Sequence, residues 1–502
     1  MAEVRSHVAR IADASCGNHS QVKPRVLYVL PALSAQGGTP QTNQDLMQAI
    51  GDRVETFVLR SNSASLELFS FRDGEYVPLE YARLESPLSA FPHRSEQYDS
   101  IFSEWLTKYQ IELVHVRHIA FHSLGLIDVA KALSVRVVFS FHDFYAICPT
   151  VKLLDENRFF CGGECTKTPG DCQHDLWADP EFPKLKNAAV FDWRKMLESA
   201  LGQCDSLVTT AESAKSLILR NFPALADIPF RVIPHGRNFD FFSDDTVPSI
   251  QVNETIRVLV PGSIGYAKGA GVLAELAAAA SDQDIEIHVL GRLTEGGPIP
   301  GVIEHGAYTR DDFVARVREI RPHIGAVLSI WPETFCHTLT EQWAAGVPVV
   351  GFDFGAVAER IRDSGAGWVL EQTTADAVLE LFADLRKNPQ LHDRAVQNVV
   401  RWQKKVGLAQ TNSWMANRYQ EIYESVHPAI SLCRESNVAC GNLSSKRAPI
   451  FRQPADWRQM AGEIGSVSII VPVHNAFDDC RRCLQSLINH TFPAVELVVV
   501  DD

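Results

Sequence analysis

Two glutamates separated by seven residues stand out among the side chains that could do chemistry. Glu333 closes an expected strand, and Glu341 lies about two turns into the helix expected after it. The amides of Phe335–Thr338 then form a helix start, where free N–H groups and the helix dipole favour a bound anion such as a diphosphate. Carboxylates repel such an anion, so they need another role, and accepting hydrogen bonds from sugar hydroxyls is one. The alternative is an ordinary helix-start glutamate and a solvated one.

Two glycine-containing turns add further candidates for an anion site. Gly37 and Gly38 follow the apolar run Val26–Leu30 and precede a helix, so the backbone there could approach a ligand closely. The turn Gly262–Gly269 follows a second apolar run and contains Lys268, whose ammonium could neutralise a phosphate. It matches neither a P-loop nor a G-x-G-x-x-G fingerprint. A plain strand-to-helix loop is the alternative for the first turn.

A histidine and an aspartate, His142 and Asp143, follow the apolar run Val135–Ser140. A histidine at the carboxyl end of a strand could hydrogen-bond a substrate or orient a charge. A structural histidine is the alternative, and for one isolated residue it is the more frequent case.

The eleven cysteines form an odd set that is mostly scattered through apolar segments, which is typical of reduced thiols. Cys148, Cys161, Cys165 and Cys172 form a cluster that could hold zinc tetrahedrally. Their spacing contains no paired C-x2-C pattern, so we expect a loop with reduced thiols and keep a structural metal as the alternative.

The composition bounds the class of protein. The chain has 502 residues, of which 46% are hydrophobic and 22% charged, with a formal net charge of −14. These values predict a soluble protein of several domains and argue against a general nucleic-acid binder. No run reaches the ~18 apolar residues of a membrane-spanning helix, and residues 1–22 lack the apolar core of a secretory signal. We therefore expect a disordered N-terminal tail and a cytoplasmic protein.

The elements that must position these residues alternate between short apolar runs and amphipathic stretches. This alternation occurs twice and predicts an α/β fold of two Rossmann-like doubly wound domains, at 23–245 and 250–426. Residues 427–465 lose the periodicity and are predicted to be a linker. Residues 466–502 contain one further β-α-β pattern, with a helix at Asp478–Asn489. The expected strands are Val26–Leu30, Leu113–Val116, Val135–Ser140, Ser206–Thr210, Arg231–Ile233, Arg257–Pro261, Ile285–Leu290, Ala326–Ile330, Pro348–Phe352, Val467–Val473 and Val495–Val500.

Taken together, the motifs between about Lys23 and Val426 resemble glycosyltransferase family 4, the retaining GT-B enzymes that use nucleotide sugars. Glu333 and Glu341 reproduce the E-x7-E signature of that family. The other family motifs follow in the expected order: Gly37-Gly38, His142-Asp143, Ile233-Pro234-His235-Gly236, Lys268-Gly269 and Gly346-Val347-Pro348-Val349-Val350.

The resemblance implies a role for each matching residue. Glu333 would bind hydroxyls of the donor sugar, and Glu341 the ribose of the nucleotide. Lys268 would hold the departing diphosphate, while His142 would lie beside the transferred sugar. Further donor-binding residues implied in this way are Gly38, Gly262, Ser263, Phe335, Cys336, His337 and Thr338. No general base is nominated.

One position departs from the family pattern. Many members have an arginine directly after the glycine equivalent to Gly262, whereas this chain has Ser263. The leaving group thereby loses a positive charge, and Arg292 is the candidate substitute.

Residues 466–502 resemble the start of a second family, glycosyltransferase family 2, whose members are inverting GT-A enzymes. The resemblance implies that Val473 and Asp501 bind a nucleotide and that a complete domain needs Mg²⁺ or Mn²⁺. The metal-binding D-x-D and the catalytic base of that family are absent from these residues, so we expect an incomplete module. An accessory β-α-β unit of the first enzyme is the alternative.

The function expected from these resemblances is transfer of a sugar, with retention, from a nucleotide-sugar donor to a glycan or lipid-linked glycan acceptor. Surface polysaccharide assembly, such as O-antigen or capsule, is the expected setting. The GT-B part is expected to need no metal or other cofactor and no nucleic acid. Because the net charge is acidic, any docking at the inner face of a membrane is expected to be local and transient. The alternatives are a non-catalytic GT-B scaffold that binds a glycan or a second transferase and, further off, a GT-B epimerase or phosphorylase.

Overall fold

The computed structural model describes residues 23–33, 38–165, 171–172, 176–177, 186, 188–239, 242, 247–251, 254–280, 283–427, 467–473 and 495–501. The chain divides into two compact units, Met1–Ser436 and Asn437–Asp502. The predicted tail at 1–22, Gly37, residues 428–465 of the predicted linker and the predicted helix Asp478–Asn489 lie outside the described residues.

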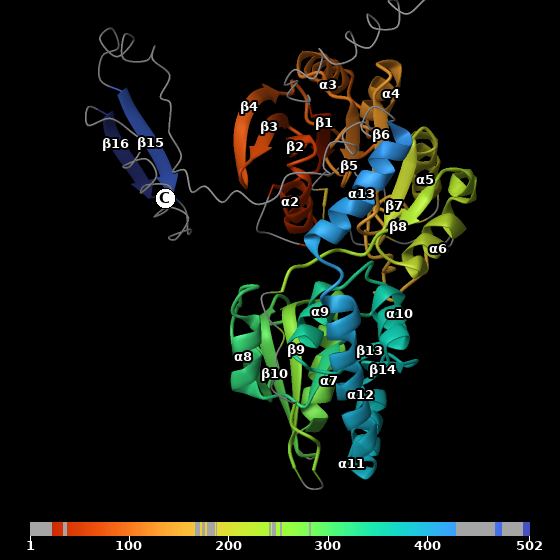
Figure 1. The fold of residues 1–502 in the computed structure, drawn as a ribbon, viewed down its shortest axis with the longest axis vertical. Helices are drawn as coiled ribbons and strands as arrows, with labels where there is room; N and C mark the ends of the chain where they lie inside the picture. The colour runs from red at the N-terminus through yellow and green to blue at the C-terminus, as the bar shows by residue number, and fades with distance from the viewer. Residues whose placement is uncertain are drawn as a thin grey trace, which may run out of the picture. The chain divides into compact units, whose positions relative to one another are not determined.

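The first half of the larger unit is built on an eight-stranded sheet (Figure 1). Five strand pairs are parallel, and the pairs β2–β3 and β3–β4 are antiparallel. The strands, in spatial order, are β4 (Glu75–Arg83), β3 (Ser65–Arg72), β2 (Glu55–Ser61), β1 (Arg25–Val29), β5 (Leu113–Val116), β6 (Arg136–Ser140), β7 (Ser206–Thr209) and β8 (Phe230–Val232).

Helices cover both faces of this sheet because alternate side chains of each buried strand point to opposite sides. In β1, Leu27 and Val29 pack into one core, whereas Val26 and Tyr28 pack into another. The first core is closed by α3 (Glu96–Lys108), α4 (Gly125–Ala132), α5 (Ala188–Leu201) and α6 (Glu212–Asn221). The second is closed by α2 (Gly38–Ile50) and α13 (Asn412–Val426).

The second half is built on a six-stranded sheet in which every pair is parallel. Its spatial order is β11 (Val302–Glu304), β10 (Ile285–Leu293), β9 (Ile256–Ile264), β12 (Ile324–Val327), β13 (Val349–Phe352) and β14 (Gly367–Leu370). On one face lie α7 (Ala270–Ala280) and α11 (Ala375–Lys387). Around the rest of the sheet lie α8 (Phe313–Ile320), α9 (His337–Ala344), α10 (Gly355–Ser364) and α12 (Pro389–Trp402). The two sheets confirm the predicted fold class.

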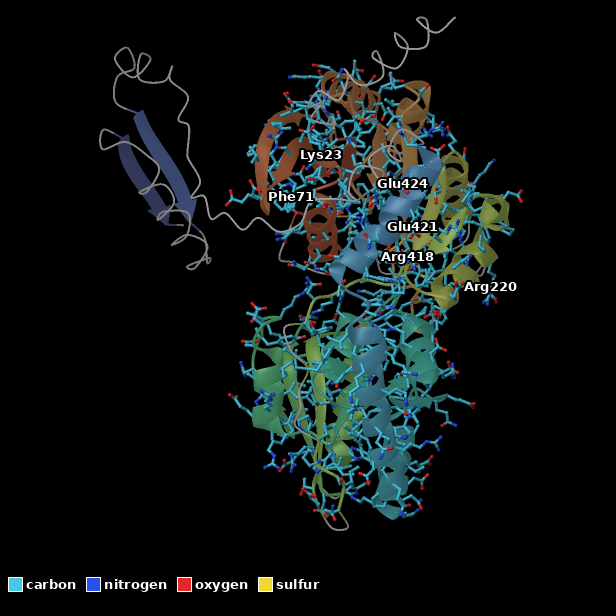
Figure 2. All side chains as sticks on the ribbon, in the orientation of Figure 1. Lys23, Phe71, Arg220, Arg418, Glu421 and Glu424 are labelled. Atoms are coloured by element: carbon cyan, nitrogen blue, oxygen red, sulfur yellow. The ribbon has the colours of Figure 1, made fainter. Side chains whose placement is uncertain are left out.

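The last helix of the larger unit does not belong to the second half, although the sequence analysis placed it there. Residues of α13 pack into the core of the first sheet and against α2. Tyr419 and Tyr423 are buried there, whereas Arg418 and Glu421 are half exposed on the outer side of the helix (Figure 2). The predicted boundary at 426 is therefore wrong for this helix: its apolar stripe is buried by the N-terminal sheet.

The predicted strands are confirmed with small shifts at their ends, but five strands were not predicted. Three of them, β2 to β4, extend the first sheet at one edge, where Val77 and Tyr81 of β4 are exposed. An exposed edge strand carries charged and polar residues, so it lacks the buried apolar run by which parallel strands are recognised. The other two, β11 and β14, are the edge strands of the second sheet.

The smaller unit contributes two described strands, β15 (Val467–Val473) and β16 (Val495–Asp501), which pair in parallel. Val473 and Asp501 face one another in the register at their ends. Among the helices in the described part of the chain, none combines the length and apolarity needed to cross a bilayer.

Candidate active site

The candidate site lies where the strand order of the second sheet reverses, between β9 and β12, which is where open α/β sheets bind ligands. Glu333 lies in the loop that joins β12 to α9, six residues beyond the last strand residue Val327. Glu341 is in the second turn of α9, which begins at His337. The strand is thus shorter than predicted, and Glu333 occupies a loop instead of closing the strand.

Glu333 is almost fully buried and forms an ion pair with Lys268. Their Oε1 and Nζ atoms are 2.7 Å apart, and Ser329 Oγ donates a hydrogen bond to the same carboxylate oxygen. The Lys268 side chain is 36% exposed, whereas that of Glu333 is 9% exposed. The pair therefore places a positive charge at the edge of the site and its carboxylate partner beneath it.

Burial alone would raise the pKa of Glu333, because a carboxylate loses its hydration there. The Lys268 ammonium and the hydrogen bonds from Lys268 and Ser329 outweigh this, so its pKa is lowered below the usual value. Burial acts in the opposite direction on Lys268, but Glu333 and the nearby Cys336 hold its pKa above the usual value. At neutral pH both groups are charged.

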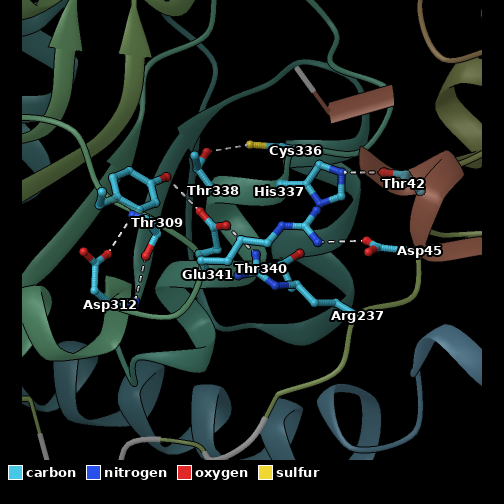
Figure 3. Close-up of polar contacts among 12 residues, drawn as sticks. Thr42, Asp45, Arg237, Thr309, Asp312, Cys336, His337, Thr338, Thr340 and Glu341 are labelled. Atoms are coloured by element: carbon cyan, nitrogen blue, oxygen red, sulfur yellow. Dashed lines mark hydrogen bonds and ion pairs between the residues drawn. The ribbon is translucent and has the colours of Figure 1, made fainter. Parts of the chain in front are cut away.

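Glu341 is held by two donors that the sequence analysis did not consider (Figure 3). Arg237 Nη1 donates to Glu341 Oε1, and the Tyr308 hydroxyl donates to Oε2 at 2.9 Å. Burial, together with the Glu341 charge and hydrogen bond, raises the pKa of Tyr308 above its usual value, so the phenol stays protonated. Both carboxylate oxygens of Glu341 are therefore oriented by the protein itself.

A pocket of about 470 Å³ lies between the two halves and in front of Glu341. The structure brings seven of the predicted residues together in its lining, and it adds residues from both halves. The lining residues are Gly38, Gln41, Gly262, Ser263, Gly291, Arg292, Ala307, Tyr308, Arg310, His337, Thr338 and Glu341.

Two glycines of the β9–α7 turn leave the room that this arrangement needs. Gly262 has φ +110°, and a Cβ there would lie 3.3 Å from Thr338 Cγ2, at the start of α9. Gly269 has φ +82°, and a Cβ there would lie 2.1 Å from the carbonyl oxygen of Leu328. Side chains at either position would be strained, and at Gly269 the backbone that carries Lys268 would have to move.

Arg292 lies beside Ser263, because the two residues are register partners on the paired strands β10 and β9. Both line the pocket. The structure therefore puts an arginine on the strand position beside the one where the family pattern has an arginine and this chain has a serine.

His142 does not line this pocket but ends a stack of three imidazoles that crosses between the halves. Its ring stacks on that of His235 at 5.3 Å, and His235 stacks on His337 at 5.2 Å. Burial is the largest of the influences that lower the pKa of each ring well below its usual value, so all three are neutral. Neither ring nitrogen of His142 has a hydrogen-bond partner among the described residues.

Polar contacts hold the two halves against each other around the site. Asp45 Oδ2 accepts from Arg310 Nη1 at 2.8 Å, and Thr334 Oγ1 donates to the His142 carbonyl at 2.6 Å. The carboxylate of Glu359 accepts from the backbone N–H of Ser213 at 2.8 Å. The shape of the pocket therefore depends on contacts between both halves.

The remaining predicted residues shape the start of α9. Cys336 precedes the helix with φ +68°, and its Sγ lies 3.2 Å from Thr338 Oγ1. Arg360 donates to the carbonyl oxygens of Phe335 and Cys336 and, at 2.7 Å, to Thr340 Oγ1. Arg360 was not predicted, because nothing in the sequence indicates that α10 lies beneath this loop.

The cysteine cluster lies apart from this pocket. Cys148 and Cys172 are buried, and Cys161 and Cys165 are half-buried. Burial is the main cause that raises the pKa of Cys148, Cys161 and Cys172. Within the described residues, no three His, Cys, Asp or Glu side chains are arranged to hold a metal ion.

Models of known families match the chain over both halves. Residues 37–241 match the model described as Glycosyltransferase Family 4, and residues 249–402 match that of Glycosyl transferases group 1. Residues 468–502 match the model of Glycosyl transferase family 2. Two doubly wound domains that share one pocket define the GT-B class of glycosyltransferase. The first large domain is therefore similar to glycosyltransferase family 4 and the second to the glycosyl transferases of group 1, and the chain is a glycosyltransferase.

Solved structures agree with this fold. Anabaena HepE in complex with UDP is 11% identical, with a TM-score of 0.51, over 80% of this chain and 100% of that one. The apo form of the lipopolysaccharide outer core galactosyltransferase WaaB is 13% identical, with a TM-score of 0.51, over 80% and 99%.

One curated relative matches a short stretch of the chain. The uncharacterized glycosyltransferase YibD of Escherichia coli K12 is 40% identical over 43 residues, which are 9% of this chain. The match spans 12% of the length of that relative.

Proposed function

We propose that the two large domains catalyse transfer of a sugar, with retention, from a nucleotide-sugar donor. The observation that carries this proposal is the Lys268–Glu333 ion pair beside the start of α9 and the pocket shared by both domains. A cation and a helix start are suited to the charge that develops on a departing diphosphate. The UDP complex of HepE, a protein of the same fold, supports a nucleotide in such a pocket.

The donor is proposed to lie across the pocket with its ribose at Glu341 and its diphosphate between Lys268 and the start of α9. Gly38, Gly262 and Thr338 would then approach the diphosphate through backbone and small side chains. Arg292 would supply the positive charge that Ser263 lacks.

The transferred sugar is proposed to lie between Glu333 and His142. The Glu333 carboxylate can accept hydrogen bonds from sugar hydroxyls, and the unpartnered nitrogens of neutral His142 can bond to a further hydroxyl. No side chain is assigned as a covalent nucleophile, so we propose attack by the acceptor on the face from which the diphosphate leaves. Contact between the domains would exclude water from this step.

The acceptor is proposed to be a glycan or a lipid-linked glycan in surface polysaccharide assembly, such as O-antigen or capsule. WaaB, a protein of the same fold, is a galactosyltransferase of the lipopolysaccharide outer core, which supports this setting. The GT-B part is proposed to act without a metal, since Lys268 and the start of α9 already provide positive potential. Docking at the inner face of a membrane, where such acceptors lie, would be local and transient.

The test is a screen of UDP-, GDP- and dTDP-sugars for thermal stabilisation of the full chain, with Glu341→Ala as the control. We expect one donor to stabilise the wild-type protein and the variant to lose that stabilisation. With that donor and acceptor glycans, the anomeric configuration of the product is then read by NMR. No stabilisation of folded protein by any donor, or an inverted product, would overturn the proposal.

A further inference from the structure

We infer that Arg237 is a positioning residue that fixes the Glu341 carboxylate, so that the site selects ribonucleotide donors over 2′-deoxyribonucleotide donors. The inference rests on the proposed function, in which Glu341 binds the ribose. It goes further by naming the residue that sets this selectivity and the sugar of the nucleotide that is accepted.

The first argument is the geometry around the Glu341 carboxylate. The side chains of Arg237 and Glu341 are only 8% and 7% exposed, and the two are bonded through Nη1 and Oε1. The hydroxyl of Tyr308 occupies Oε2. A carboxylate has about four acceptor positions, so about two remain for a ligand. Because Glu341 lines the pocket, these positions suit two neighbouring hydroxyls.

The Arg237 guanidinium also compensates the charge of the buried Glu341 carboxylate. A buried carboxylate without a partner would be costly and would repel a diphosphate bound nearby. The Arg237 guanidinium cancels that charge while leaving acceptor positions free. Its planar fork also restricts the rotation of the carboxylate more than a lysine would, because several donors lie in one fixed plane.

The third argument is the place of Arg237 in the chain. It lies in the segment that leads from β8 towards the second domain, and its backbone N–H donates to the Gln410 carbonyl at 2.9 Å. Its guanidinium also lies over the Phe239 ring, 5.1 Å from the centroid. The preceding Gly236 packs so closely that a Cβ there would lie 2.3 Å from the Thr411 carbonyl oxygen. Gln410 and Thr411 belong to the segment that returns to the first domain before α13. The two connections between the domains therefore meet at the residue that holds Glu341.

These contacts predict how the site distinguishes nucleotides. A site built to hydrogen-bond a hydroxyl strongly disfavours the analogue that lacks it, because the buried polar group is left without its partner. With Glu341 held in one orientation, removal of the 2′-hydroxyl should cost one such bond. With Glu341 free to rotate, the carboxylate could turn to the remaining 3′-hydroxyl, and the preference would shrink.

The experiment compares the Kd of UDP with that of 2′-deoxy-UDP by calorimetry on the full chain, or GDP and 2′-deoxy-GDP if guanosine donors stabilise it. We expect wild-type protein to bind the deoxy form about tenfold more weakly, equivalent to about 1.4 kcal/mol. Arg237→Met should bring the ratio close to one, and Arg237→Lys to an intermediate value. The diphosphate contacts should keep the deoxy form bound in both variants.

The matched control is Arg53→Met. Arg53 bonds to Asn417 and Gln420 and so also ties separate parts of the chain together, but it does not contact Glu341. The ratio of the two Kd values in Arg53→Met should stay at the wild-type value.

The outcomes distinguish failure of the proposed function from failure of this inference. If the wild-type protein binds none of UDP, GDP and dTDP, the proposed donor class fails. If it binds dTDP but no ribonucleotide, the donor class stands and the inference fails. If it binds both forms equally, or if the ratio survives undiminished in the Arg237 variants, only the inference fails. Should Arg237→Met not fold, Arg237→Lys decides alone, because an undiminished ratio there also overturns the inference.

Discussion

The two carboxylates of the E-x7-E motif differ in how each is paired. Glu333 and Glu341 are equally buried, and each faces one cation. The partner of Glu333 is Lys268, a flexible ammonium that is 36% exposed. The partner of Glu341 is Arg237, a rigid fork that is 8% exposed and anchored by the connections between the domains.

This difference separates the chemistry proposed for the two ends of the E-x7-E motif. An ammonium on a flexible stem can follow a charge that moves from the sugar to the diphosphate. A guanidinium locked on a carboxylate cannot move in this way, but it can keep acceptor atoms in one orientation. One motif therefore combines two kinds of ion pair. The Lys268–Glu333 pair can respond to charge that moves during the reaction, and the Arg237–Glu341 pair is fixed for recognition of the donor.

The largest expected effect comes from Glu333→Gln. The amide keeps the shape but loses the charge that pairs with Lys268, so kcat for sugar transfer should fall by about 10²–10³. Nucleotide affinity should change by less than about threefold. Steady-state kinetics together with calorimetry on UDP or GDP measure both quantities. Glu341→Gln should instead lower mainly the nucleotide affinity. If both variants changed kcat and affinity in the same way, the two glutamates would not have different roles.

An intermediate effect is expected from Lys268→Met on stability. Since the pKa of Glu333 is lowered in the folded wild-type protein, its stabilising contribution is complete above the usual carboxyl pKa and is lost as the pH falls through the lowered value. In the variant, burial raises that pKa, so the carboxylate destabilises the fold at neutral pH and ceases to do so on acidification.

We expect Lys268→Met to cost about 1–3 kcal/mol at pH 7, less than a fully buried pair because Lys268 is partly exposed. The gap in Tm between wild type and variant should narrow from pH 7 towards pH 4. Thermal denaturation across that range measures it, with Lys268→Met/Glu333→Gln as the control whose gap should stay flat. A gap that widens on acidification would contradict the assigned pair.

The smallest effect is expected from Tyr308→Phe, which removes one neutral donor from Glu341 and leaves Arg237 in place. The loss should be about 0.5–1.5 kcal/mol of nucleotide affinity, or a two- to tenfold rise in Kd, with kcat unchanged. Titration calorimetry of the bound nucleotide checks it. A fall in kcat without a change in Kd would assign Tyr308 to the sugar-transfer step. It would contradict the separation of roles between Glu333 and Glu341.

Local sequence patterns predicted most of the fold. The buried strands were recognisable because parallel strands covered on both faces need continuous apolar runs, as in Val26 to Leu30. The edge strand β4 escaped because it has no buried residue, and β2 and β3 escaped because polar residues interrupt their short apolar runs. The helix α13 was predicted as a helix but assigned to the wrong domain, since amphipathicity shows that a face is buried and not which sheet buries it.

The candidate site was likewise predicted only in part. Glu333, Glu341, Lys268 and His142 were nominated from residue type, spacing and the family resemblance, and their roles remain predictions. Arg237 was missed although it directly follows the predicted Ile233–Gly236 motif, because a lone arginine in a connecting segment carries no signal of its partner.

The sequence by itself therefore determined the class of fold and the candidate residues near the carboxyl ends of the strands, because these depend on local periodicity and on fixed spacing along the chain. Only the tertiary structure decided which cation pairs with which carboxylate, that Arg292 lies beside Ser263, and that α13 returns to the first domain. Those relations join residues that are far apart in sequence, and they follow from how the sheets pack and from where the connections cross.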